Sequence, residues 1–434
     1  MEISELYEIF TKHPVVTTDS RDCPKNSMFF ALKGESFNGN KFASMAIEKG
    51  CAVAVVDEKE YAKENDNHYI IVDDVLKTLK LLANYHRRTL GTKIIGITGT
   101  NGKTTTKELV SAVLQKKYNI LYTQGNFNNE IGVPKTVLRL KKEHELAVVE
   151  MGASHPGDIK SLVDVVEPDF GIITNVGRAH LQGFGSFEGV VKTKGELYDF
   201  LRTKKDSTVF IHNENEHLLN ISHDLKLVKY GTAKVDNLFA NGEIIECAPF
   251  LHFRWRHLNG EWHDVMTHMI GSYNIHNMLA AACIGLYFGV SEEQICDALS
   301  NYVPSNNRSQ LDVTASNKLI VDAYNANPTS MKAALENFRD MEVKPKMAIL
   351  GDMRELGAVS NEEHQKVVDF LKNVSSIDQV WLVGEEFYKT TCDFKKFKDA
   401  EEVKEEIKRK KPEGYYILIK GSNGIKLFQL PDLL

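Results

Sequence analysis

The chain has 434 residues, of which 42% are hydrophobic and 26% are charged, and its formal net charge at pH 7 is −6. This length predicts about three domains, and the composition is that of a soluble globular protein. The small negative charge offers no basic surface for nucleic acid or an acidic membrane, so we expect small-molecule substrates and no nucleic-acid partner.

Cysteine usage and the first residues indicate a reducing compartment. The chain begins with Met-Glu-Ile-Ser-Glu-Leu-Tyr-Glu, which is acidic and is no signal peptide, and it has no run of about eighteen apolar residues that could span a bilayer. We therefore expect a cytoplasmic protein without a membrane span, acting as a monomer.

The cysteines are scattered singly, without C-x-x-C pairs, which predicts free thiols at Cys23, Cys51, Cys247, Cys283, Cys296 and Cys392.

Residues 1–88 alternate short apolar runs with helical patterns. The apolar runs predict strands at residues 28–32, 52–56 and 69–72. A helix at residues 75–90 is expected to lead into the next domain. We interpret this segment as a small α/β domain without a phosphate loop.

The strongest motif lies near residue 100. A buried strand is predicted at residues 94–97, followed by a glycine-bearing turn and a helix from Thr104 onward. From Gly96 the spacing is G-x-x-x-x-G-K-T, the pattern of loops whose backbone N–H groups bind phosphate at a helix N-terminus. Lys103 would reach the β and γ phosphates, and the Thr104 hydroxyl would bind magnesium. The sequence therefore predicts a nucleoside triphosphate site.

Residues 89–302 are expected to form the central domain around this loop. Two further buried strands are predicted at residues 146–150 and 170–174, and a half-exposed strand at residues 251–257. The domain closes with an apolar helix after Asn277. In a doubly wound parallel sheet, ligands bind outside the carboxyl ends of the strands.

Residues 303–434 restart the alternation of strands and helices. Apolar runs predict strands at residues 319–321, 347–350, 380–383 and 416–419. The highly charged residues 400–411 predict a helix with a solvated face. We expect a third α/β domain with a mostly parallel sheet, so the whole chain is of the α/β class.

Beyond the loop, position alone identifies a few candidate residues. Glu150 ends a strand where an acid commonly completes a magnesium site, although a carboxylate that caps the next helix is the alternative. His180 follows another strand end, where a structural histidine is the alternative. Lys194 has the pattern of a surface lysine at a helix start. The amide-rich residues 126–134 suit either polar substrate groups or a simple turn.

The order of the motifs resembles that of the Mur ligases, and this resemblance covers essentially the whole chain. The motifs are Gly-Thr-Asn-Gly-Lys-Thr-Thr at residues 99–105, Asn-Phe-Asn-Asn-Glu-Ile-Gly-Val-Pro at 126–134, Val-Glu-Met-Gly-Ala at 149–153, Thr-Asn-Val-Gly-Arg-Ala-His at 174–180, Lys-Gly-Glu at 194–196, Asn-Ile-His-Asn at 274–277 and Asp-Ala-Tyr-Asn-Ala-Asn-Pro at 322–328. Asp-Ser-Arg at residues 19–21 is similar to the family's UDP-binding domain. Leu-Gly-Asp-Met-Arg-Glu-Leu-Gly at residues 350–357 and Lys-Gly-Ser at 420–422 are typical of one branch of the family.

The resemblance implies the three-domain Mur ligase architecture, with residues 1–88 binding the UDP-substrate, 89–302 binding ATP, and a Rossmann-like domain at 303–434 closing over the site. It implies an ATP-dependent amide ligase that joins D-alanyl-D-alanine to UDP-N-acetylmuramoyl-tripeptide through an acyl phosphate, for peptidoglycan synthesis. The implied ATP contacts are Gly99, Thr100, Asn101, Gly102, Lys103, Thr104, Thr105, Asn277, Arg308 and Asp322. The implied substrate contacts are Ser20, Arg21, Asn128, Asn129, Tyr324 and Asn325.

The resemblance also implies two magnesium ions, one held by Thr104 and Glu150 and the other by His180 and Lys194. Lys194 matches a lysine that family members carry as a carbamate, whose negative oxygen can bind magnesium as an ammonium cannot. Lys103, His180 and Lys194 are therefore the implied catalytic residues.

Three positions depart from the family pattern. Asn423 stands where many relatives carry an arginine, and Val321 replaces the first aspartate of a pair, which leaves Asp322 for that role. Tyr273 stands in place of a histidine before Asn274.

Two alternative functions remain open at this point. One is another ligase of the same superfamily, either the one that adds the third peptide residue or a folylpolyglutamate synthase. The other is an ATPase switch or transporter that couples hydrolysis to a partner.

Overall fold

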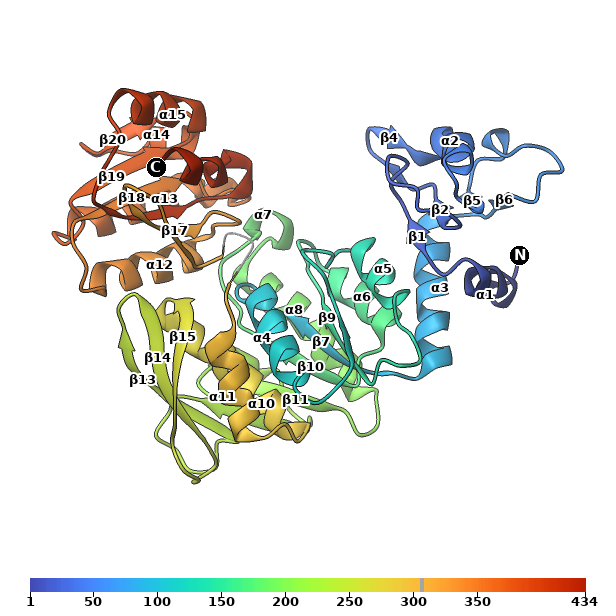
Figure 1. The fold of residues 1–434 in the computed structure, drawn as a ribbon, viewed down its shortest axis with the longest axis horizontal. Coiled ribbons are helices and arrows are strands. Elements are labelled where there is room, and N and C mark those ends of the chain that lie inside the picture. Colours follow the sequence, from blue (N-terminus) through green and yellow to red (C-terminus); the bar gives the residue numbers. More distant parts are fainter. Residues whose placement is uncertain (305–307) are drawn as a thin grey trace.

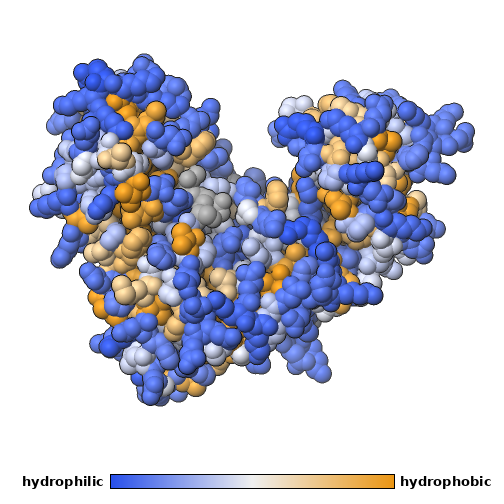
Figure 2. Space-filling view, in the orientation of Figure 1, coloured by the Kyte–Doolittle hydropathy of each residue, from blue (hydrophilic) through white to orange (hydrophobic). Residues whose placement is uncertain are grey.

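The computed structural model describes residues 1–304 and 308–434, which form three α/β domains, each around its own main sheet (Figure 1). The N-terminal and C-terminal domains stand on opposite sides above the central domain (Figure 1). Figure 2 shows these outer domains as separate lobes whose exposed surface is largely hydrophilic. Across the part of the chain that is described, no helix is both long and apolar enough to cross a membrane.

The N-terminal domain is built on parallel strands, as the apolar runs predict. Within residues 1–90, the sheet order is β1 (Val16–Thr17), β2 (Met28–Phe30), β5 (Val53–Val56) and β6 (Tyr69–Ile71), beside a hairpin of β3 (Lys33–Gly34) and β4 (Phe37–Asn38). Its helices are α1 (Ile3–Lys12), α2 (Ala43–Glu48) and α3 (Val75–Leu90). Asp74 caps α3 through the backbone N–H of Lys77, and Gly91, with a φ of +70°, ends it. The predicted helix at residues 75–90 is confirmed.

The central domain holds the largest sheet. Within residues 91–304, nine strands lie in the order β15-β14-β13-β12-β11-β10-β7-β9-β8, parallel except at the β13–β14 and β14–β15 pairs. The strands are β7 (Lys93–Thr98), β8 (Ile120–Tyr122), β9 (Leu146–Glu150), β10 (Phe170–Ile173), β11 (Thr208–His212), β12 (Leu227–Gly231), β13 (Ala240–Cys247), β14 (Phe250–His257) and β15 (His263–Ile270). The predicted half-exposed strand is confirmed as β14, in which Leu251, Phe253 and Trp255 are buried and alternate with more exposed residues.

Helices cover both faces of this sheet. They are α4 (Lys103–Leu114), α5 (Gly132–Val137), α6 (Asp158–Val166), α7 (Leu181–Phe184), α8 (Phe187–Arg202), α9 (Glu216–Asn220), α10 (Ile275–Tyr287) and α11 (Glu292–Asn301). Apolar residues of α4, α10 and α11 pack on one face, and those of α5, α6 and α8 pack on the other. The apolar helix expected after Asn277 is α10, and its two helical neighbours and the sheet bury it.

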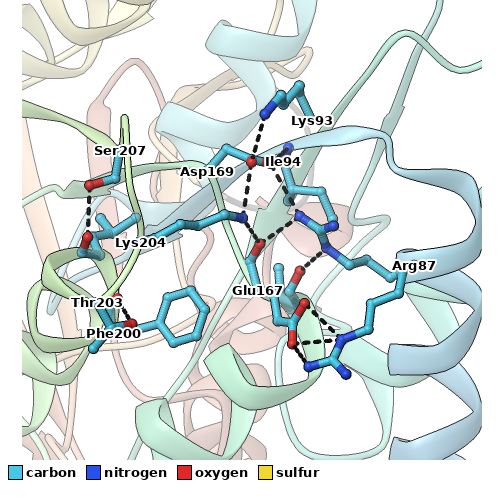
Figure 3. Close-up of polar contacts among 12 residues, drawn as sticks. Arg87, Lys93, Ile94, Glu167, Asp169, Phe200, Thr203, Lys204 and Ser207 are labelled. Atoms are coloured by element: carbon cyan, nitrogen blue, oxygen red, sulfur yellow. Dashed lines mark hydrogen bonds and ion pairs between the residues drawn. The ribbon is translucent and has the colours of Figure 1, made fainter.

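A buried carboxylate fixes α3 to the central domain. Asp169, which precedes β10, accepts a hydrogen bond from the backbone N–H of Ile94 at 2.9 Å. Its other partners are cations, with Arg87 of α3 at 3.2 Å, Lys93 at 3.1 Å and Lys204 at 2.9 Å (Figure 3). This network lies at the N-terminal ends of the parallel strands, whereas the phosphate loop lies at their C-terminal ends.

The C-terminal domain has the mostly parallel sheet that the sequence predicts. Within residues 308–434, six strands lie in the order β16-β17-β21-β18-β19-β20, and only the β16–β17 pair is antiparallel. They are β16 (Gln310–Val313), β17 (Lys318–Asp322), β18 (Lys346–Gly351), β19 (Gln379–Val383), β20 (Lys395–Phe397) and β21 (Tyr416–Lys420). The helices are α12 (Pro328–Asp340), α13 (Ser360–Lys372), α14 (Glu385–Tyr388) and α15 (Ala400–Arg409).

Candidate active site

The phosphate loop connects β7 to the N-terminus of α4, as predicted. Gly99 and Gly102 have φ angles of +142° and +76°, which L side chains rarely adopt. A Cβ on Gly99 would lie 2.1 Å from the Oγ1 of Thr174, so this position also lacks space for a side chain. The backbone N–H of Asn101 donates to the Oδ1 of Asn175 at 3.0 Å. The end of the neighbouring strand β10 therefore fixes the shape of the loop.

Lys103 folds back over this loop. Its Nζ donates to the carbonyl oxygens of Gly99 and Thr100, both at 2.9 Å. Burial lowers the pKa of Lys103 to about 8, while the Glu150 carboxylate opposes this change and Arg308 adds to it. Phosphate oxygens are stronger acceptors than carbonyls, because they carry charge, so a bound nucleotide can take over these hydrogen bonds.

Glu150, at the end of β9, is fully buried beside the loop. Its Oε1 accepts hydrogen bonds from Thr104 Oγ1 at 3.1 Å and from Asn128 Nδ2 at 2.7 Å, whereas its Oε2 is buried and has no partner in the described part of the chain. A buried carboxylate oxygen without a partner is costly, and a hard oxygen ligand suits Mg²⁺. Thr104 and Glu150 therefore fit a magnesium ion.

The described ranges 1–304 and 308–434 contain no group of three or more His, Cys, Asp or Glu side chains that could hold a metal ion. Magnesium in nucleotide enzymes commonly takes one or two protein ligands and completes its shell with phosphate and water oxygens. The Thr104–Glu150 pair is of this kind.

His180 and Lys194 both lie close to the Phe184 ring. The ring centroids of His180 and Phe184 are 6.2 Å apart, and Lys194 Nζ lies 5.3 Å from the Phe184 centroid. Lys194 is 2% exposed, and its Nζ donates to the carbonyl oxygen of Ala153 at 3.3 Å. Burial, with the like charge of Lys103, lowers the pKa of Lys194 well below its usual value. Burial also lowers the pKa of the His180 imidazole. The Lys194 amine is thus prone to be neutral.

Asn277 ties α10 to the phosphate-loop helix. Its Oδ1 accepts a hydrogen bond from Thr106 Oγ1 at 3.1 Å, and its Nδ2 donates to Asn274 Oδ1 at 2.7 Å. A Cβ on Gly102 would lie 2.8 Å from the same Oδ1, so Asn277 borders the loop itself.

The C-terminal domain contributes a second group of the predicted residues. The Arg308 guanidinium lies 3.9 Å from the centroid of the Tyr324 ring, and its Nε is buried without a hydrogen-bond partner among residues 1–304 and 308–434. Asp322, at the end of β17, forms an ion pair with Lys420 at 2.5 Å. Since Lys420 is nearly fully buried, this pair fixes the carboxylate at the edge of the site.

The central and C-terminal domains meet at the phosphate loop. Asn327 Nδ2 donates to Asn101 Oδ1 at 2.7 Å, across 226 residues of sequence. The His180 imidazole contacts the Glu355 carboxylate in a second interdomain contact. These contacts bring residues from both domains to one site.

These residues surround a cavity of about 830 Å³. The predicted residues that line it are Thr100, Asn101, Gly102, Lys103, Thr104, Thr105, Asn128, Asn129, Glu150, His180, Asn277, Arg308, Asp322, Tyr324 and Asn325. Gly99 and Lys194 lie behind this lining, in contact with Lys103 and Ala153.

Ser20 and Arg21 lie elsewhere, on the loop between β1 and β2 of the N-terminal domain. The Ser20 carbonyl accepts a hydrogen bond from Lys49 Nζ at 2.8 Å, and the exposed Arg21 forms an ion pair with Asp19 at 2.7 Å. The structure does not bring them to the cavity. They stay predicted contacts for the distant end of a long substrate.

Three aromatic residues that the sequence analysis did not select also line the cavity. His212 ends β11, Tyr230 lies near the end of β12, and His276 opens α10. The ring centroids of His212 and His276 are 4.1 Å apart, and burial followed by the charge of His212 lowers the pKa of His276 to about 4. The sequence signal of His212 and Tyr230 is their position at strand ends, where ligands bind in parallel sheets, and that of His276 is its place in the Asn-Ile-His-Asn motif at residues 274–277.

A phosphate loop, a buried carboxylate beside it and a cavity shared with a third domain define a three-domain, nucleotide-binding α/β protein. The chain belongs to the Mur ligase family. The family models that match are "Mur ligase family, catalytic domain" over residues 14–87, "Mur ligase middle domain" over 97–285 and "Mur ligase, glutamate ligase domain" over 307–423.

Individual relatives match over most of the chain. The UDP-N-acetylmuramoyl-tripeptide--D-alanyl-D-alanine ligase of Bacillus subtilis (strain 168) is 35% identical, over 96% of this chain and 92% of its own. The ligase of the same name from Escherichia coli (strain K12) is 34% identical, over 86% and 81%. A crystal structure of MurF from Acinetobacter baumannii is 28% identical, with a TM-score of 0.88 over 99% and 98% of the two chains. The predicted family and three-domain fold are thus confirmed.

Proposed function

We propose that this protein is the ATP-dependent ligase that joins D-alanyl-D-alanine to UDP-N-acetylmuramoyl-tripeptide, for peptidoglycan synthesis. The observation that carries the proposal is the Thr104–Glu150 pair, which lies beside the phosphate loop in a cavity shared by two domains. The choice of substrates is supported by relatives of that name that match nearly end to end.

The reaction has two steps. ATP transfers its γ-phosphoryl group to the terminal carboxylate of the tripeptide, which gives an acyl phosphate and ADP. The amine of D-alanyl-D-alanine then attacks the carbonyl carbon, a C–N bond forms, the C–O bond to phosphate breaks, and the amine loses a proton. Activation is required because a carboxylate is a poor electrophile, and phosphoryl transfer depends mainly on positioning and charge neutralisation.

The residues of the loop would perform the first step. Lys103 and the loop N–H groups would hold the transferring phosphoryl group. Asn277 would lie at the adenine, Arg308 at the phosphates and Asp322 at the ribose. Lys103 is already directed at the loop, with its ammonium on two carbonyls that phosphate oxygens can replace.

Magnesium would be held by Thr104 and Glu150, and a second ion by His180 and Lys194, where it would neutralise charge on the phosphates and the carboxylate. Lys194 would serve as a carbamate, formed when its neutral amine adds to carbon dioxide and a proton is lost. The buried amine and its lowered pKa support this chemistry, because only the neutral amine reacts.

The UDP-peptide would extend from the cavity toward the N-terminal domain. Its peptide end would contact Asn128, Asn129, Tyr324 and Asn325, and Ser20 and Arg21 would bind its uridine diphosphate end. Since one chain supplies all of these residues, we propose that the protein acts as a monomer in the cytoplasm.

The test is a product assay with the purified protein, ATP and Mg²⁺. UDP-N-acetylmuramoyl-tripeptide and D-alanyl-D-alanine should give phosphate release and a product whose mass is that of the pentapeptide. A parallel reaction with UDP-muramoyl-dipeptide and a diamino acid should give neither. Product in the second reaction alone, or steady ATP hydrolysis without an amine acceptor, would overturn the proposal in favour of another ligase or an ATPase.

A further inference from the structure

Glu355 reaches the active site from the C-terminal domain. It follows β18 within residues 350–357, a stretch for which no function has been given so far. Its carboxylate contacts Nδ1 of His180, and 59% of its side chain stays exposed. Both residues have left-handed φ angles, +65° for Glu355 and +51° for His180. Such strain costs about 1 kcal/mol or more per residue, and it concentrates at functional sites.

The backbone around Glu355 is fixed on both sides. The backbone N–H of Arg354 donates to Ser422 Oγ at 2.9 Å, and the Leu356 side chain is only 3% exposed. The carbonyl oxygen of Glu355 accepts a hydrogen bond from the backbone N–H of Gln182, in α7, at 3.3 Å. A held backbone thus presents this carboxylate to the opposite domain.

Other carboxylates near His180 and Lys194 already have partners. Glu150 accepts hydrogen bonds from Thr104 and Asn128. Asp158 accepts two backbone N–H groups, at 2.8 and 2.9 Å, and Glu196 accepts two, both at 2.8 Å. Glu355, by contrast, has no lysine or arginine within ion-pair distance anywhere in residues 1–304 and 308–434. Its negative charge is therefore available to a ligand.

The proposed reaction needs such a charge. The cavity is lined by Lys103 and Arg308, which suit phosphate and carboxylate groups but repel an ammonium ion. The amine acceptor arrives partly as an ammonium ion, because the pKa of an α-amino group is about 8. A carboxylate in contact with His180, which lines the cavity, offers the compensating charge.

We propose that Glu355 binds the ammonium group of the D-alanyl-D-alanine acceptor and so positions its nitrogen beside the activated carboxyl group. This inference rests on the ligase reaction proposed above. It adds an acceptor-binding residue from the C-terminal domain to the nucleotide site of the central domain.

The test compares two nucleophiles in Glu355→Gln, which keeps the size of the side chain and removes its charge. With D-alanyl-D-alanine, KM should rise about 10- to 100-fold, the range of a charged hydrogen bond, while KM for ATP and for the UDP-tripeptide stays within about twofold. Hydroxylamine, which is uncharged near pH 8, attacks the same acyl phosphate and releases phosphate, so hydroxamate formation should equal that of the wild type. For Glu355→Asp, which keeps the charge, KM for D-alanyl-D-alanine should fall between the values of the wild type and Glu355→Gln.

The matched control is Glu363→Gln. Glu363 forms another ion pair between these domains, with Arg178 at 3.4 Å. The Glu363→Gln variant should keep KM for the dipeptide within about twofold of the wild-type value. An unchanged KM for the dipeptide in Glu355→Gln would overturn the proposal, as would a parallel loss of hydroxamate formation. A wild-type protein that forms neither hydroxamate nor peptide would overturn the ligase reaction itself, and the role of Glu355 with it.

Discussion

The Thr104 hydroxyl lies 3.1 Å from the Glu150 carboxylate, although 46 residues separate them in sequence. The contact exists because β7 and β9 are parallel neighbours in the sheet, so the loop after β7 and the last residue of β9 meet at one edge. The second oxygen of Glu150 is buried, and none of the residues that the structure describes is its partner. The chemistry of the site therefore depends on the register of these two strands.

Replacing this carboxylate should weaken magnesium binding without unfolding the protein. In Glu150→Gln, the amide oxygen can still accept a hydrogen bond from Thr104, but the negative charge is lost. We expect the rate to fall about 10²- to 10³-fold, the usual effect of removing one electrostatic contact to the transition state. Phosphate release, measured as a function of Mg²⁺ concentration, should show a raised magnesium requirement.

The control for this change is Glu143→Gln, in the exposed stretch just before β9. It removes the same charge far from the loop and should leave both the rate and the magnesium requirement unchanged. An unaltered magnesium requirement in Glu150→Gln would contradict the assigned metal site.

The phosphate loop should not tolerate a methyl group at Gly99. The Cβ of Gly99→Ala would lie 2.1 Å from Thr174 Oγ1 and 3.0 Å from the Thr174 backbone nitrogen, and the φ of +142° is strained for alanine. We expect nucleotide affinity to fall about tenfold or more, measured by calorimetry with a non-hydrolysable ATP analogue. Gly125→Ala is the matched control, since its φ is +53° and no atom lies within 4 Å of the added Cβ. It should cost about 1 to 2 kcal/mol of stability and leave nucleotide affinity intact.

Local pattern was enough to predict the loop and the strands beside it. The glycine spacing, the apolar run of β7 and the stripe of α4 all lie within about twenty residues, and Glu150 was found because it ends an apolar run. For the same reason, the predicted helix at residues 400–411 is confirmed as α15, which buries Val403 and Ile407 and solvates its charged face.

The contacts between domains could not be predicted from local sequence patterns. Asn101 meets Asn327 across 226 residues, and no periodicity in either segment indicates how two separate domains dock. His212 and His276, whose ring centroids lie 4.1 Å apart, were not selected for a related reason. His212 has no motif, and within the Asn-Ile-His-Asn motif at residues 274–277 only Asn277 was given a role. Their pairing follows from the packing of α10 against β11, which no local pattern in the sequence specifies.

Lys194 offers a direct test of the carbamate. In Lys194→Ala the rate should fall about 10²- to 10³-fold, because an oxygen ligand is lost from the site. Lys194→Arg keeps a positive charge but cannot form the carbamate, so it should be as inactive as the alanine variant. Initial rates and thermal unfolding midpoints are the measurements, and the midpoint should change little.

The control for Lys194 lies on the same helix. Lys192 is exposed on α8, two residues away, and Lys192→Ala should retain full activity. A well-folded Lys194→Arg protein with nearly normal turnover would refute the carbamate and leave a structural role for the lysine.

Asp169 should stabilise the junction between α3 and the central domain in a pH-dependent way. Burial is the largest influence on its pKa and acts to raise it, but the Ile94 N–H group and the ammonium groups of Lys204 and Lys93 together outweigh burial, so the pKa is lowered. Asp169→Asn removes a buried charge from three cations, and we expect it to lower the free energy of unfolding by about 3 kcal/mol at neutral pH. Asp199→Asn, which breaks an exposed pair with Arg202, is the control and should cost less than about 1 kcal/mol.

The sign of the pH effect follows from that lowered pKa. A carboxyl group that is more acidic in the folded protein than in the unfolded chain stabilises the fold above its unfolded pKa of about 3.9, and this contribution declines as pH falls below that value toward the folded pKa. The difference in urea midpoint between wild type and Asp169→Asn should therefore be constant from about pH 5 to 8 and shrink below about pH 4. A difference that persists undiminished in acid would mean that the substitution acts by replacing a hydrogen-bond acceptor with an amide donor that faces the cations, and not through the loss of charge.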